Sequence, residues 1–250
     1  MKKVSVIMSA FNAGKYIDEA ICSILNQTYN NIEFIIIDDG STDDTLGIIK
    51  SFDDARIVLL SRENKGLTKS LNEAINLATG DYICRQDADD ISCKTRIEKQ
   101  VDFLECNNAD AVFCQSDDGI NILPKWYMTK RKLNINNLSF GNVITHGTLL
   151  CRSEVLMNNS YNEKWVVGQD YELWLRLLSL KYKLMLLREP LYYLTRHENS
   201  ISAKKSELQE KLATEAVIEH GLDVNNFIKK SDCSKVKLLK KLKKVVTLYA

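Results

Sequence analysis

Three carboxylates follow a short apolar run in the first half of the chain. Tyr82-Ile83-Cys84-Arg85-Gln86 leads into Asp87, Asp89 and Asp90. Carboxylates crowded at a strand end repel one another, and a divalent cation stabilises such a cluster. Mg²⁺ and Mn²⁺ suit oxygen ligands of this kind and keep positions open for substrate phosphates. Because an isolated Asp-x-Asp also occurs in solvated acidic turns, the motif alone decides little.

The residues before this motif alternate between strand and helix patterns. Positions 4–8 and 32–37 are continuous apolar runs, typical of strands buried on both faces of a parallel sheet. Between them, apolar residues at positions 17, 20, 21, 24 and 25 have helical spacing. The alternation continues with a helix near 45–52, a strand at 56–60, a helix at 67–78 and a strand at 81–85. The sequence therefore predicts an α/β domain with a mostly parallel central sheet flanked by helices.

Polar or aromatic side chains stand at three of the predicted strand ends. They are Phe11-Asn12, Asp38-Asp39 and the acids of 87–90. Ligands of such sheets bind beyond the carboxyl ends of the strands, so we expect these ends to form one crevice. The turn at 9–14 lacks the G-x-G-x-x-G spacing, and the chain has no G-x-x-x-x-G-K-[ST] loop. Phosphate is therefore expected to be held mainly by a metal ion.

Four motifs, in this order, resemble those of family 2 glycosyltransferases of the GT-A fold. They are Val4-Ser5-Val6-Ile7-Met8-Ser9-Ala10-Phe11-Asn12, Ile37-Asp38-Asp39-Gly40-Ser41-Thr42-Asp43, Asn64-Lys65-Gly66-Leu67 with Ser70-Leu71-Asn72, and Gln86-Asp87-Ala88-Asp89-Asp90. The resemblance covers roughly residues 2–202, and four ordered motifs are far more specific than one. The last two are similar to those of bacterial O-antigen and capsule β-glycosyltransferases.

The resemblance implies a UDP-sugar donor and a uracil site in the first half of the chain. Phe11 corresponds to an aromatic residue that stacks on the uracil ring, and Asn12 belongs to the same nucleotide-binding turn. Asp39 corresponds to a carboxylate that accepts the imide hydrogen of uracil. Asp38 either shares that role or caps the turn.

The resemblance also implies a site for Mn²⁺ or Mg²⁺. Asp87 matches the first acid of the metal motif, expected near the ribose or the metal, and Ala88 lies between the acids. Asp89 matches the acid that ligates the metal directly. The segment 192–202 resembles a loop whose histidine, here His197, completes the metal shell or touches the diphosphate. A structural or solvated histidine is the alternative for His197.

One departure from the family pattern concerns the diphosphate. The frequent Ala-Arg-Asn of the family is Ser70-Leu71-Asn72 here, which removes one arginine contact. Lys65 or Lys69 is a candidate replacement, and an ordinary surface lysine is the alternative for each.

The segment 167–177 resembles the family's Glu-Asp helix start, in which the aspartate is the catalytic base. The pair is Gln169-Asp170 here, so the base is retained while the glutamate that would tune its pKa is missing. A helix N-cap before an apolar helix at 171–178 is the alternative role for Asp170.

The acceptor side is expected between the acids and this base. Residues 142–152 read as a strand after a polar loop, and they resemble a segment that shapes the acceptor pocket. His146 is a candidate acceptor contact or a buried structural imidazole, two alternatives that stay open. Gln169, Trp165 and Trp174 are further candidates on this side, with the helical spacing of Trp174 also fitting a core position.

The resemblance implies an inverting transferase that moves a sugar from a UDP-α-sugar to a hydroxyl and forms a β-glycoside. Galactose is the first expectation for the sugar, with glucose and N-acetylglucosamine as alternatives. The expected acceptor is a lipid-diphosphate-linked sugar or a growing surface polysaccharide. A nucleotidyltransferase would need a glycine- and arginine-rich loop after the first strand, where this chain has Ser9-Ala10-Phe11-Asn12. A non-catalytic sugar-nucleotide-binding protein is the remaining alternative.

We expect a catalytic domain at 1–202, with a nucleotide-binding half at 1–90 and an acceptor-binding half at 91–202, and a helical appendage at 203–250. The appendage contains Lys229, Lys230, Lys235, Lys237, Lys240, Lys241, Lys243 and Lys244. Such a basic amphipathic segment either lies on an anionic membrane surface or packs on the domain.

Composition sets the expected location and excludes some partners. The net charge of +1 argues against a nucleic-acid partner. Seven cysteines without a C-x-x-C pair fit reduced thiols. The sequence has no signal-peptide pattern and no apolar run of about twenty residues. We therefore expect a cytoplasmic protein at the inner face of the cell membrane.

Overall fold

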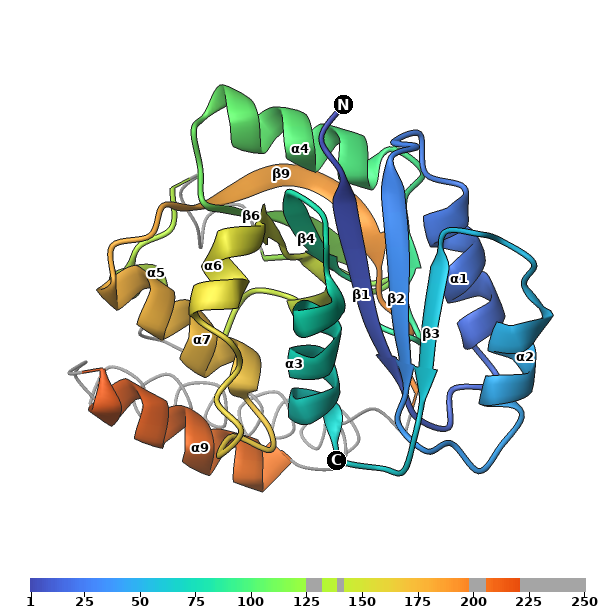
Figure 1. Ribbon diagram of the computed structural model, residues 1–250. Helices are drawn as coiled ribbons and strands as arrows, with labels where there is room; N and C mark the ends of the chain where they lie inside the picture. Colours follow the sequence, from blue (N-terminus) through green and yellow to red (C-terminus); the bar gives the residue numbers. More distant parts are fainter. Residues whose placement is uncertain (125–131, 139–141, 198–205, 221–250) are drawn as a thin grey trace, which may run out of the picture.

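A curled mixed sheet with helices on both faces forms the centre of the protein (Figure 1). The computed structural model describes residues 1–124, 132–138, 142–197 and 206–220. The strands are β1 (Val4–Ala10), β2 (Ile32–Asp38), β3 (Ile57–Ser61), β4 (Tyr82–Arg85), β5 (Ile91–Ser92), β6 (Ala111–Asp117), β7 (Ile122–Leu123), β8 (Leu150–Arg152) and β9 (Leu184–Tyr193). The helices are α1 (Ile17–Leu25), α2 (Thr45–Ser51), α3 (Leu67–Leu77), α4 (Arg96–Cys106), α5 (Ile135–Leu138), α6 (Ser153–Asn158), α7 (Gln169–Ser179) and α9 (Ser206–Glu219).

The first four long strands are parallel, as predicted. β2 pairs with β1 and β3, and β1 pairs with β4, all in parallel register. Because side chains alternate between the two faces of a strand, the apolar runs fill two separate cores. Ile35 and Ile37 of β2 face the core under α3, α6 and α7, whereas Phe34 and Ile36 face the core under α1, α2 and α4. The carboxyl ends of these strands therefore lie together, at the lower edge in Figure 1.

The second half of the sheet is mixed. β8 is antiparallel to β4 and β6, β9 is parallel to β6, and β5 is antiparallel to β9. Strand order across the sheet is β3-β2-β1-β4-β8-β6-β9-β5, with β7 paired to β6. β9 thus brings residues 192–193 back beside the segment that follows β4.

The prediction of one strand across 142–152 is wrong. A 3₁₀ helix, His146–Thr148, precedes the short β8. The turn is closed locally, because the Thr145 carbonyl accepts hydrogen bonds from both the backbone N–H and the hydroxyl of Thr148. Gly147 approaches Tyr192 so closely that a Cβ would collide with the tyrosine hydroxyl. These contacts bend the chain at 146–148, so a continuous strand across 142–152 cannot form.

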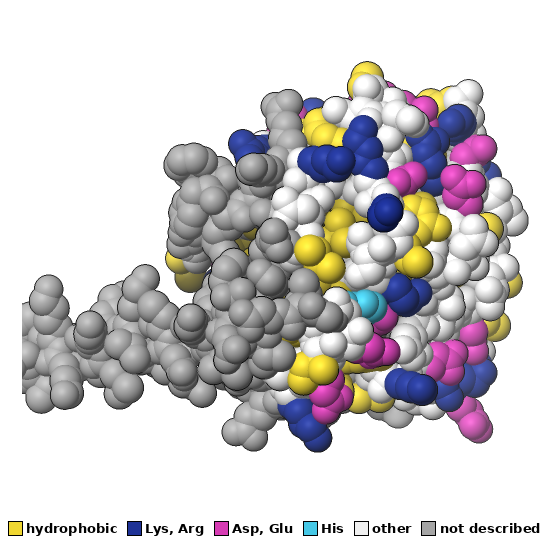
Figure 2. Space-filling view, turned by 90° about the vertical axis from the view of Figure 1, so that its left-hand side faces the viewer, with side chains coloured by type: hydrophobic (Ala, Val, Ile, Leu, Met, Phe, Trp, Pro, Cys, Tyr) yellow, Lys and Arg dark blue, Asp and Glu magenta, His cyan; other side chains and the backbone are white. Residues whose placement is uncertain are grey.

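The described part of the C-terminal region packs on the domain. α9 lies against α7, and Ala216 and Val217 are fully buried in the core under α7. The lysine-rich segment 229–244 lies outside the described residues. No helix in the described ranges combines the length and apolarity needed to cross a bilayer. The face shown in Figure 2 carries apolar side chains near its centre, with acidic and basic side chains distributed around them.

Candidate active site

The carboxylate of Asp39 is held at the end of β2 by three donors. The backbone N–H groups of Lys65 and Gly66 donate to its two oxygens at 2.8 and 2.9 Å, and Arg62 forms an ion pair with it. Gly66 has a φ of 89°, which turns the chain into α3 so that both N–H groups point at Asp39. A carboxylate offers about four acceptor positions, so one position stays open to an imide hydrogen.

Asp38 binds within its own turn. Its oxygens accept hydrogen bonds from the Ser41 backbone N–H at 3.2 Å and from the Ser61 hydroxyl at 2.7 Å. These contacts tie the end of β2 to the end of β3. They correspond to the turn-capping role that the sequence left open for Asp38.

The turn after β1 presents an open aromatic ring beside this carboxylate pair. Phe11 is 51% exposed, so a face of its ring is available for stacking. Asn12 adopts a φ of 51°, a left-handed conformation that asparagine tolerates. Its side-chain oxygen accepts the Thr42 backbone N–H at 2.8 Å, and its own N–H donates to the Ser41 hydroxyl at 3.0 Å. The turns after β1 and β2 therefore form one connected rim.

Asp87 is fixed by a buried arginine. Arg85 is fully buried and pairs with the Asp87 carboxylate at 2.6 Å. Burial opposes ionisation of Asp87, but the charge of Arg85 and its hydrogen bond outweigh burial and lower the pKa of this carboxyl. The Asp87 backbone N–H donates to the Tyr192 hydroxyl at 3.0 Å. Both partners were missed by the sequence analysis.

A second buried arginine, Arg96, contacts Arg85 and Tyr192, the two partners of Asp87. Arg96 donates to the carbonyls of Gly147 at 2.6 Å and Arg85 at 2.8 Å, and its guanidinium lies 5.1 Å from the centre of the Tyr192 ring. Arg96 thereby links α4, β4, β9 and the 3₁₀ turn. The sequence gives a signal for both arginines, because each lies within or beside an apolar segment. A buried arginine needs a charged or hydrogen-bonding partner.

Asp89 and His197 face each other across the site. His197 Nε2 lies 2.9 Å from Asp89 Oδ2. Burial and the neighbouring charge of Asp87 raise the pKa of the Asp89 carboxyl. The other ring nitrogen of His197, Nδ1, is buried without a hydrogen-bond partner in the part of the chain that the structure describes. The structure thus brings together two of the residues predicted to hold a metal.

Asp90 has a different role from its neighbour. Its Oδ1 accepts the Thr195 backbone N–H at 2.8 Å, which anchors the segment after β9. Burial, followed by the charges of Asp87 and Asp89, raises the pKa of Asp90 to about 8.

These residues fit a divalent cation that is shared with a substrate. Carboxylate oxygen and imidazole nitrogen suit Mn²⁺, and the crowded acids are groups that a cation would stabilise. No set of three His, Cys, Asp or Glu side chains is assembled with metal-binding geometry within the described ranges. Such a partial ligand set is characteristic of Mg²⁺ and Mn²⁺ sites that substrate phosphates complete.

Asp170 lies in the first turn of α7, at the second helical residue. Gly168, with a φ of 69°, precedes the helix, so the N-cap alternative for Asp170 is wrong. Asn142 donates to Asp170 Oδ2 at 2.5 Å. Burial raises the pKa of Asp170 to about 6 against hydrogen bonds from the backbone and Asn142, and the charge of Asp87 adds a smaller increase. Asp170 and the acids after β4 therefore interact within one site.

Gln169 precedes Asp170 and is 5% exposed. Its Oε1 is buried and has no hydrogen-bond partner among the described residues. An amide at this position adds no negative charge to the surroundings of Asp170.

The structure corrects the expectation for Trp174. Its side chain is fully buried and packs edge-on against Phe113, with ring centres 4.7 Å apart. Trp165 is 5% exposed. Neither indole offers an open face to a sugar, and Trp174 occupies the core position that its helical spacing also indicated.

His146 fits the structural alternative. Its Nε2 lies 2.7 Å from the Tyr161 hydroxyl. Burial, and then the charge of Arg85, lowers the pKa of His146 to about 3, so the imidazole is neutral at physiological pH. A contact of His146 with an acceptor stays a prediction, because one ring nitrogen is not accounted for by this bond.

The two lysines on the diphosphate side differ in their contacts. Lys65 Nζ lies 2.8 Å from Glu73 Oε1, so its charge is partly neutralised. Lys69 is exposed in the first turn of α3. The contact of Lys69 with the diphosphate stays a prediction.

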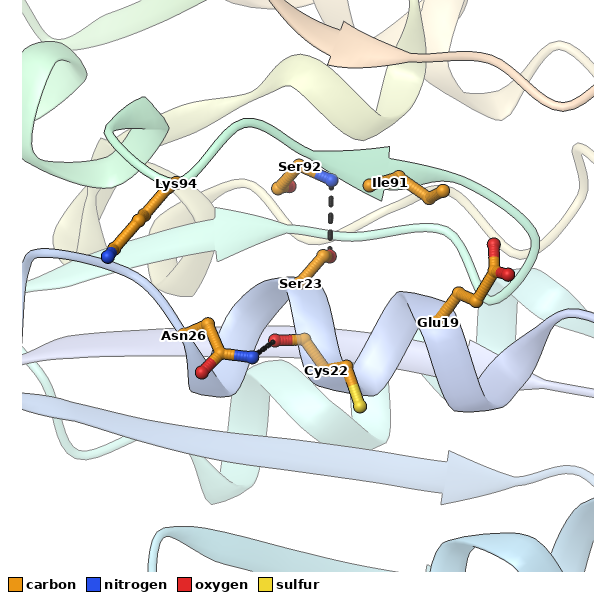
Figure 3. Close-up of a pocket in the computed structure, with 7 residues that line it drawn as sticks. All are labelled: Glu19, Cys22, Ser23, Asn26, Ile91, Ser92 and Lys94. Atoms are coloured by element: carbon orange, nitrogen blue, oxygen red, sulfur yellow. Dashed lines mark hydrogen bonds between the residues drawn. The ribbon is translucent and has the colours of Figure 1, made fainter.

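A shallow groove of about 330 Å³ lies between α1 and β5 (Figure 3). It is lined by Glu19, Cys22, Ser23, Asn26, Ile91, Ser92 and Lys94. The Ser92 backbone N–H donates to the Ser23 hydroxyl at 3.1 Å and joins the two walls. The groove adjoins the acidic cluster through Ile91, but none of the predicted site residues lines it.

Known proteins share both the sequence and the fold of this chain. The glucosyltransferase WfaP of Escherichia coli, named UDP-Glc:alpha-D-GlcNAc-diphosphoundecaprenol beta-1,3-glucosyltransferase, is 32% identical over 209 residues, which cover 82% of each chain. The structure of TarS from S. aureus in complex with UDP-GlcNAc has a TM-score of 0.74 at 19% identity and covers 91% of this chain and 71% of TarS.

Glucosyl-3-phosphoglycerate synthase from Mycobacterium tuberculosis, solved with Mn²⁺, UDP and glucosyl-3-phosphoglycerate, has a TM-score of 0.64 at 19% identity. The match covers 89% of this chain and 81% of the synthase. These solved structures establish the GT-A fold that the sequence predicted. Residues 5–158 match the family described as Glycosyl transferase family 2. The chain therefore belongs to glycosyl transferase family 2 and is a glycosyltransferase.

Proposed function

We propose that the protein is an inverting, metal-dependent enzyme that transfers a sugar from a UDP-α-sugar to a hydroxyl of a lipid-diphosphate-linked sugar or surface polysaccharide. The observation that carries this proposal is the carboxylate of Asp170. It is buried, its pKa is raised to about 6, and it feels the charge of Asp87 at the metal motif. A base with a pKa near the working pH, beside a site for a diphosphate, suits proton removal from an attacking hydroxyl.

In this proposal Asp170 accepts the proton of the acceptor hydroxyl while that oxygen forms a bond to the anomeric carbon. The bond from the anomeric carbon to the diphosphate breaks at the same time, and UDP leaves with the bonding electron pair. A single displacement from the opposite face inverts the anomeric configuration, so an α-linked donor gives a β-glycoside. The hydrogen bond from Asn142 at 2.5 Å orients the base.

Asp89 and His197, with Asp87, are the residues that would hold Mn²⁺ or Mg²⁺. A cation bound there would neutralise the charge that develops on the departing diphosphate. The Arg85 ion pair keeps Asp87 ionised and in place. The Mn²⁺ and UDP in the structure of the synthase from M. tuberculosis support this assignment.

The nucleotide is proposed to bind residues 1–90 and the acceptor residues 91–202. Phe11 stacks on uracil, Asn12 shapes the rim, and Asp39 accepts the imide hydrogen at its open position. Lys69 contacts the diphosphate, and Ala88 leaves room beside the ribose. His146 and Gln169 are the acceptor-side candidates that stay in the proposal.

The donor sugar in this proposal is a hexose or an N-acetylhexosamine. Galactose was the first expectation from the sequence, and the name of WfaP, a UDP-Glc enzyme 32% identical to this chain, now gives equal support to glucose. The acceptor in that name is a GlcNAc linked to diphosphoundecaprenol, which supports a lipid-linked acceptor here. N-acetylglucosamine remains the third candidate.

A lipid-linked acceptor would place the enzyme at the inner face of the cell membrane. The eight lysines between 229 and 244 are the sequence feature that supports contact with anionic lipid. A variant with these lysines replaced by glutamine tests the contact, because it leaves the packed helix α9 intact. Co-sedimentation with anionic liposomes should fall in this variant, and unchanged binding would contradict the membrane contact.

The deciding experiment is UDP release from a panel of UDP-sugars with Mn²⁺, with and without a GlcNAc- or GalNAc-diphosphate-lipid analogue. Release from one donor that depends on the acceptor would support the proposal, and NMR of the product would give the linkage. Asp170→Asn is the control variant, since it keeps the side-chain shape and cannot accept the proton. Metal-dependent UDP binding without turnover across the panel would favour a non-catalytic binding protein.

A further inference from the structure

The aromatic ring of Tyr16 stacks on the imidazole of His197. Their ring centres lie 4.8 Å apart, and the planes differ by 20°. The contact joins the turn after β1 to the segment after β9, which are far apart in the sequence. Both segments border the acids of the metal motif, because His197 Nε2 lies 2.9 Å from Asp89.

Hydrogen bonds hold the backbone of Tyr16 at the start of α1. It is the residue before α1, its backbone N–H donates to the Ala13 carbonyl at 2.8 Å, and its carbonyl accepts the Ala20 N–H at 3.3 Å. Ala13 is itself fixed by the Thr45 hydroxyl at 2.8 Å. These bonds fix the backbone position from which the tyrosine ring projects.

Backbone hydrogen bonds anchor the segment that carries His197, but these bonds do not hold its imidazole ring. Thr195 donates to Asp90, and Leu194 donates to the Asp117 carbonyl at 2.8 Å. These bonds fix the path of the chain but do not contact the imidazole, whose Nε2 lies 2.9 Å from Asp89. The stack with Tyr16 is a second contact, and it restricts the plane of the ring.

We propose that Tyr16 is a positioning residue that holds the His197 imidazole against Asp89 and thereby strengthens binding of the nucleoside diphosphate and its divalent cation. The affinity role of Tyr16 rests on the proposed function, whereas the stack itself does not. Tyr16 acts through His197, so it needs no contact with the substrate.

The geometry is tested first without any ligand. The chain has three histidines, His146, His197 and His220, so the imidazole signals can be assigned by NMR from single variants. A ring stacked on Tyr16 is shielded, and the His197 signals should move downfield in Tyr16→Leu. Tyr16→Phe keeps an aromatic ring and should keep the shielded positions. Coincident His197 signals in Tyr16→Leu and the parent would overturn the inference.

The consequence is tested by a double-mutant cycle on UDP affinity in the presence of Mn²⁺, measured by calorimetry. Tyr16→Leu should weaken binding by about two- to tenfold, the range expected for loss of an aromatic pair. Tyr16→Phe should stay within about twofold of the parent. In the His197→Ala background, Tyr16→Leu should change the affinity by less than about twofold, because its partner is gone. An equal loss in both backgrounds would overturn the inference.

Failure of the proposed function gives a different pattern. Absence of Mn²⁺-dependent UDP binding in the parent would contradict that function and the affinity role of Tyr16 with it, while the NMR result would still decide whether the stack exists. Binding that depends on His197 and Asp89 but not on Tyr16 would overturn only the positioning role.

Discussion

The carboxylates at the end of β2 and those around the end of β4 have opposite surroundings. Asp38 and Asp39 each accept hydrogen bonds from the chain itself, and Asp39 adds an ion pair with Arg62. Asp170 is also buried and accepts hydrogen bonds from Asn142 and the backbone, and Asp89, whose side chain is 32% exposed, faces His197; burial nevertheless raises the pKa of both carboxyls. The carboxylates after β2 therefore hold their turn together, whereas at Asp89 and Asp170 burial outweighs the hydrogen bonds.

The difference agrees with what each site is proposed to bind. A carboxylate that has most of its donors supplied by the protein can hold a turn and recognise one additional N–H. A carboxylate whose burial outweighs its hydrogen bonds gains more from a cation or a proton, which is the property that metal binding and general-base catalysis require. Replacing aspartate by asparagine at both places should therefore have opposite consequences.

The largest effect is expected for turnover in Asp170→Asn. The amide cannot accept the acceptor's proton, so kcat should fall by about 10²- to 10⁴-fold. UDP affinity in the presence of Mn²⁺ should stay close to that of the parent, because Asp170 is not a predicted ligand of either. Steady-state kinetics and calorimetry check the two parts. Turnover equal to the parent's would show that another group is the base.

Asp39→Asn should instead destabilise the protein. The amide would set an NH₂ group against backbone donors or give up the ion pair with Arg62, at a loss of roughly 2–4 kcal/mol in the free energy of unfolding. Urea unfolding monitored by circular dichroism measures this loss. A variant as stable as the parent would mean that the hydrogen bonds at Asp39 do not hold the turn, and the comparison of the two sites would fail.

The neighbours Asp89 and Asp90 sharpen the comparison within one site. Asp89→Asn should lower Mn²⁺ affinity by about 10- to 100-fold, because it removes a charged ligand. Asp90→Asn should change that affinity by less than about tenfold, because Asp90 accepts the Thr195 backbone N–H and the oxygen of an asparagine side chain can accept the same bond. Mn²⁺ titration followed by electron paramagnetic resonance distinguishes them, and equal losses would contradict the separate roles.

The convergence of the ends of β1, β2 and β4 could be predicted from sequence because it depends on local patterns. The run 32–37 is apolar at nearly every position, which identifies a strand buried on both faces, and β2 is indeed buried throughout. Adjacent parallel strands must end at the same edge, so the grouping of Phe11, Asp39 and Asp87 followed from that assignment. Local periodicity was sufficient here because neighbouring elements in sequence are neighbours in space.

The contacts between distant segments could not be predicted in the same way. Asp87 meets Tyr192, and Asp89 meets His197, only because β9 lies between β6 and β5 and ends beside the acids. No local pattern encodes that strand order. The bend at Gly147 was missed for a similar reason, since it depends on the approach of Tyr192.

The unfavourable surroundings of Asp170 also predict a gain in stability when it is replaced. Its folded-state pKa of about 6 exceeds the value of 3.8 for the free side chain, so the folded protein binds more protons between these two pH values. Stability of the parent should therefore fall as pH rises through this window, by an amount on the order of 1–3 kcal/mol. Asp170→Asn carries no such penalty and should be more stable than the parent at pH 7.5 but not at pH 4. Urea unfolding at both pH values measures the difference, and a gain independent of pH would contradict the assigned cause.

The smallest effect is expected for Gln169, whose neutral side chain adds no negative charge beside Asp170. Gln169→Glu would place a second carboxylate beside Asp170 and raise its pKa further, by about one unit for a like charge at this distance. Because Asp170 must be ionised to accept a proton, the acid limb of kcat/KM, expected near pH 6 in the parent, should move to higher pH by the same amount. Gln169→Leu changes the polarity without adding charge and should leave the acid limb in place. If the profile moved equally in both variants, the shift would be caused by packing around α7. The acid limb would then not report the charge environment of Asp170, which is the property that distinguishes this site from the one at Asp39.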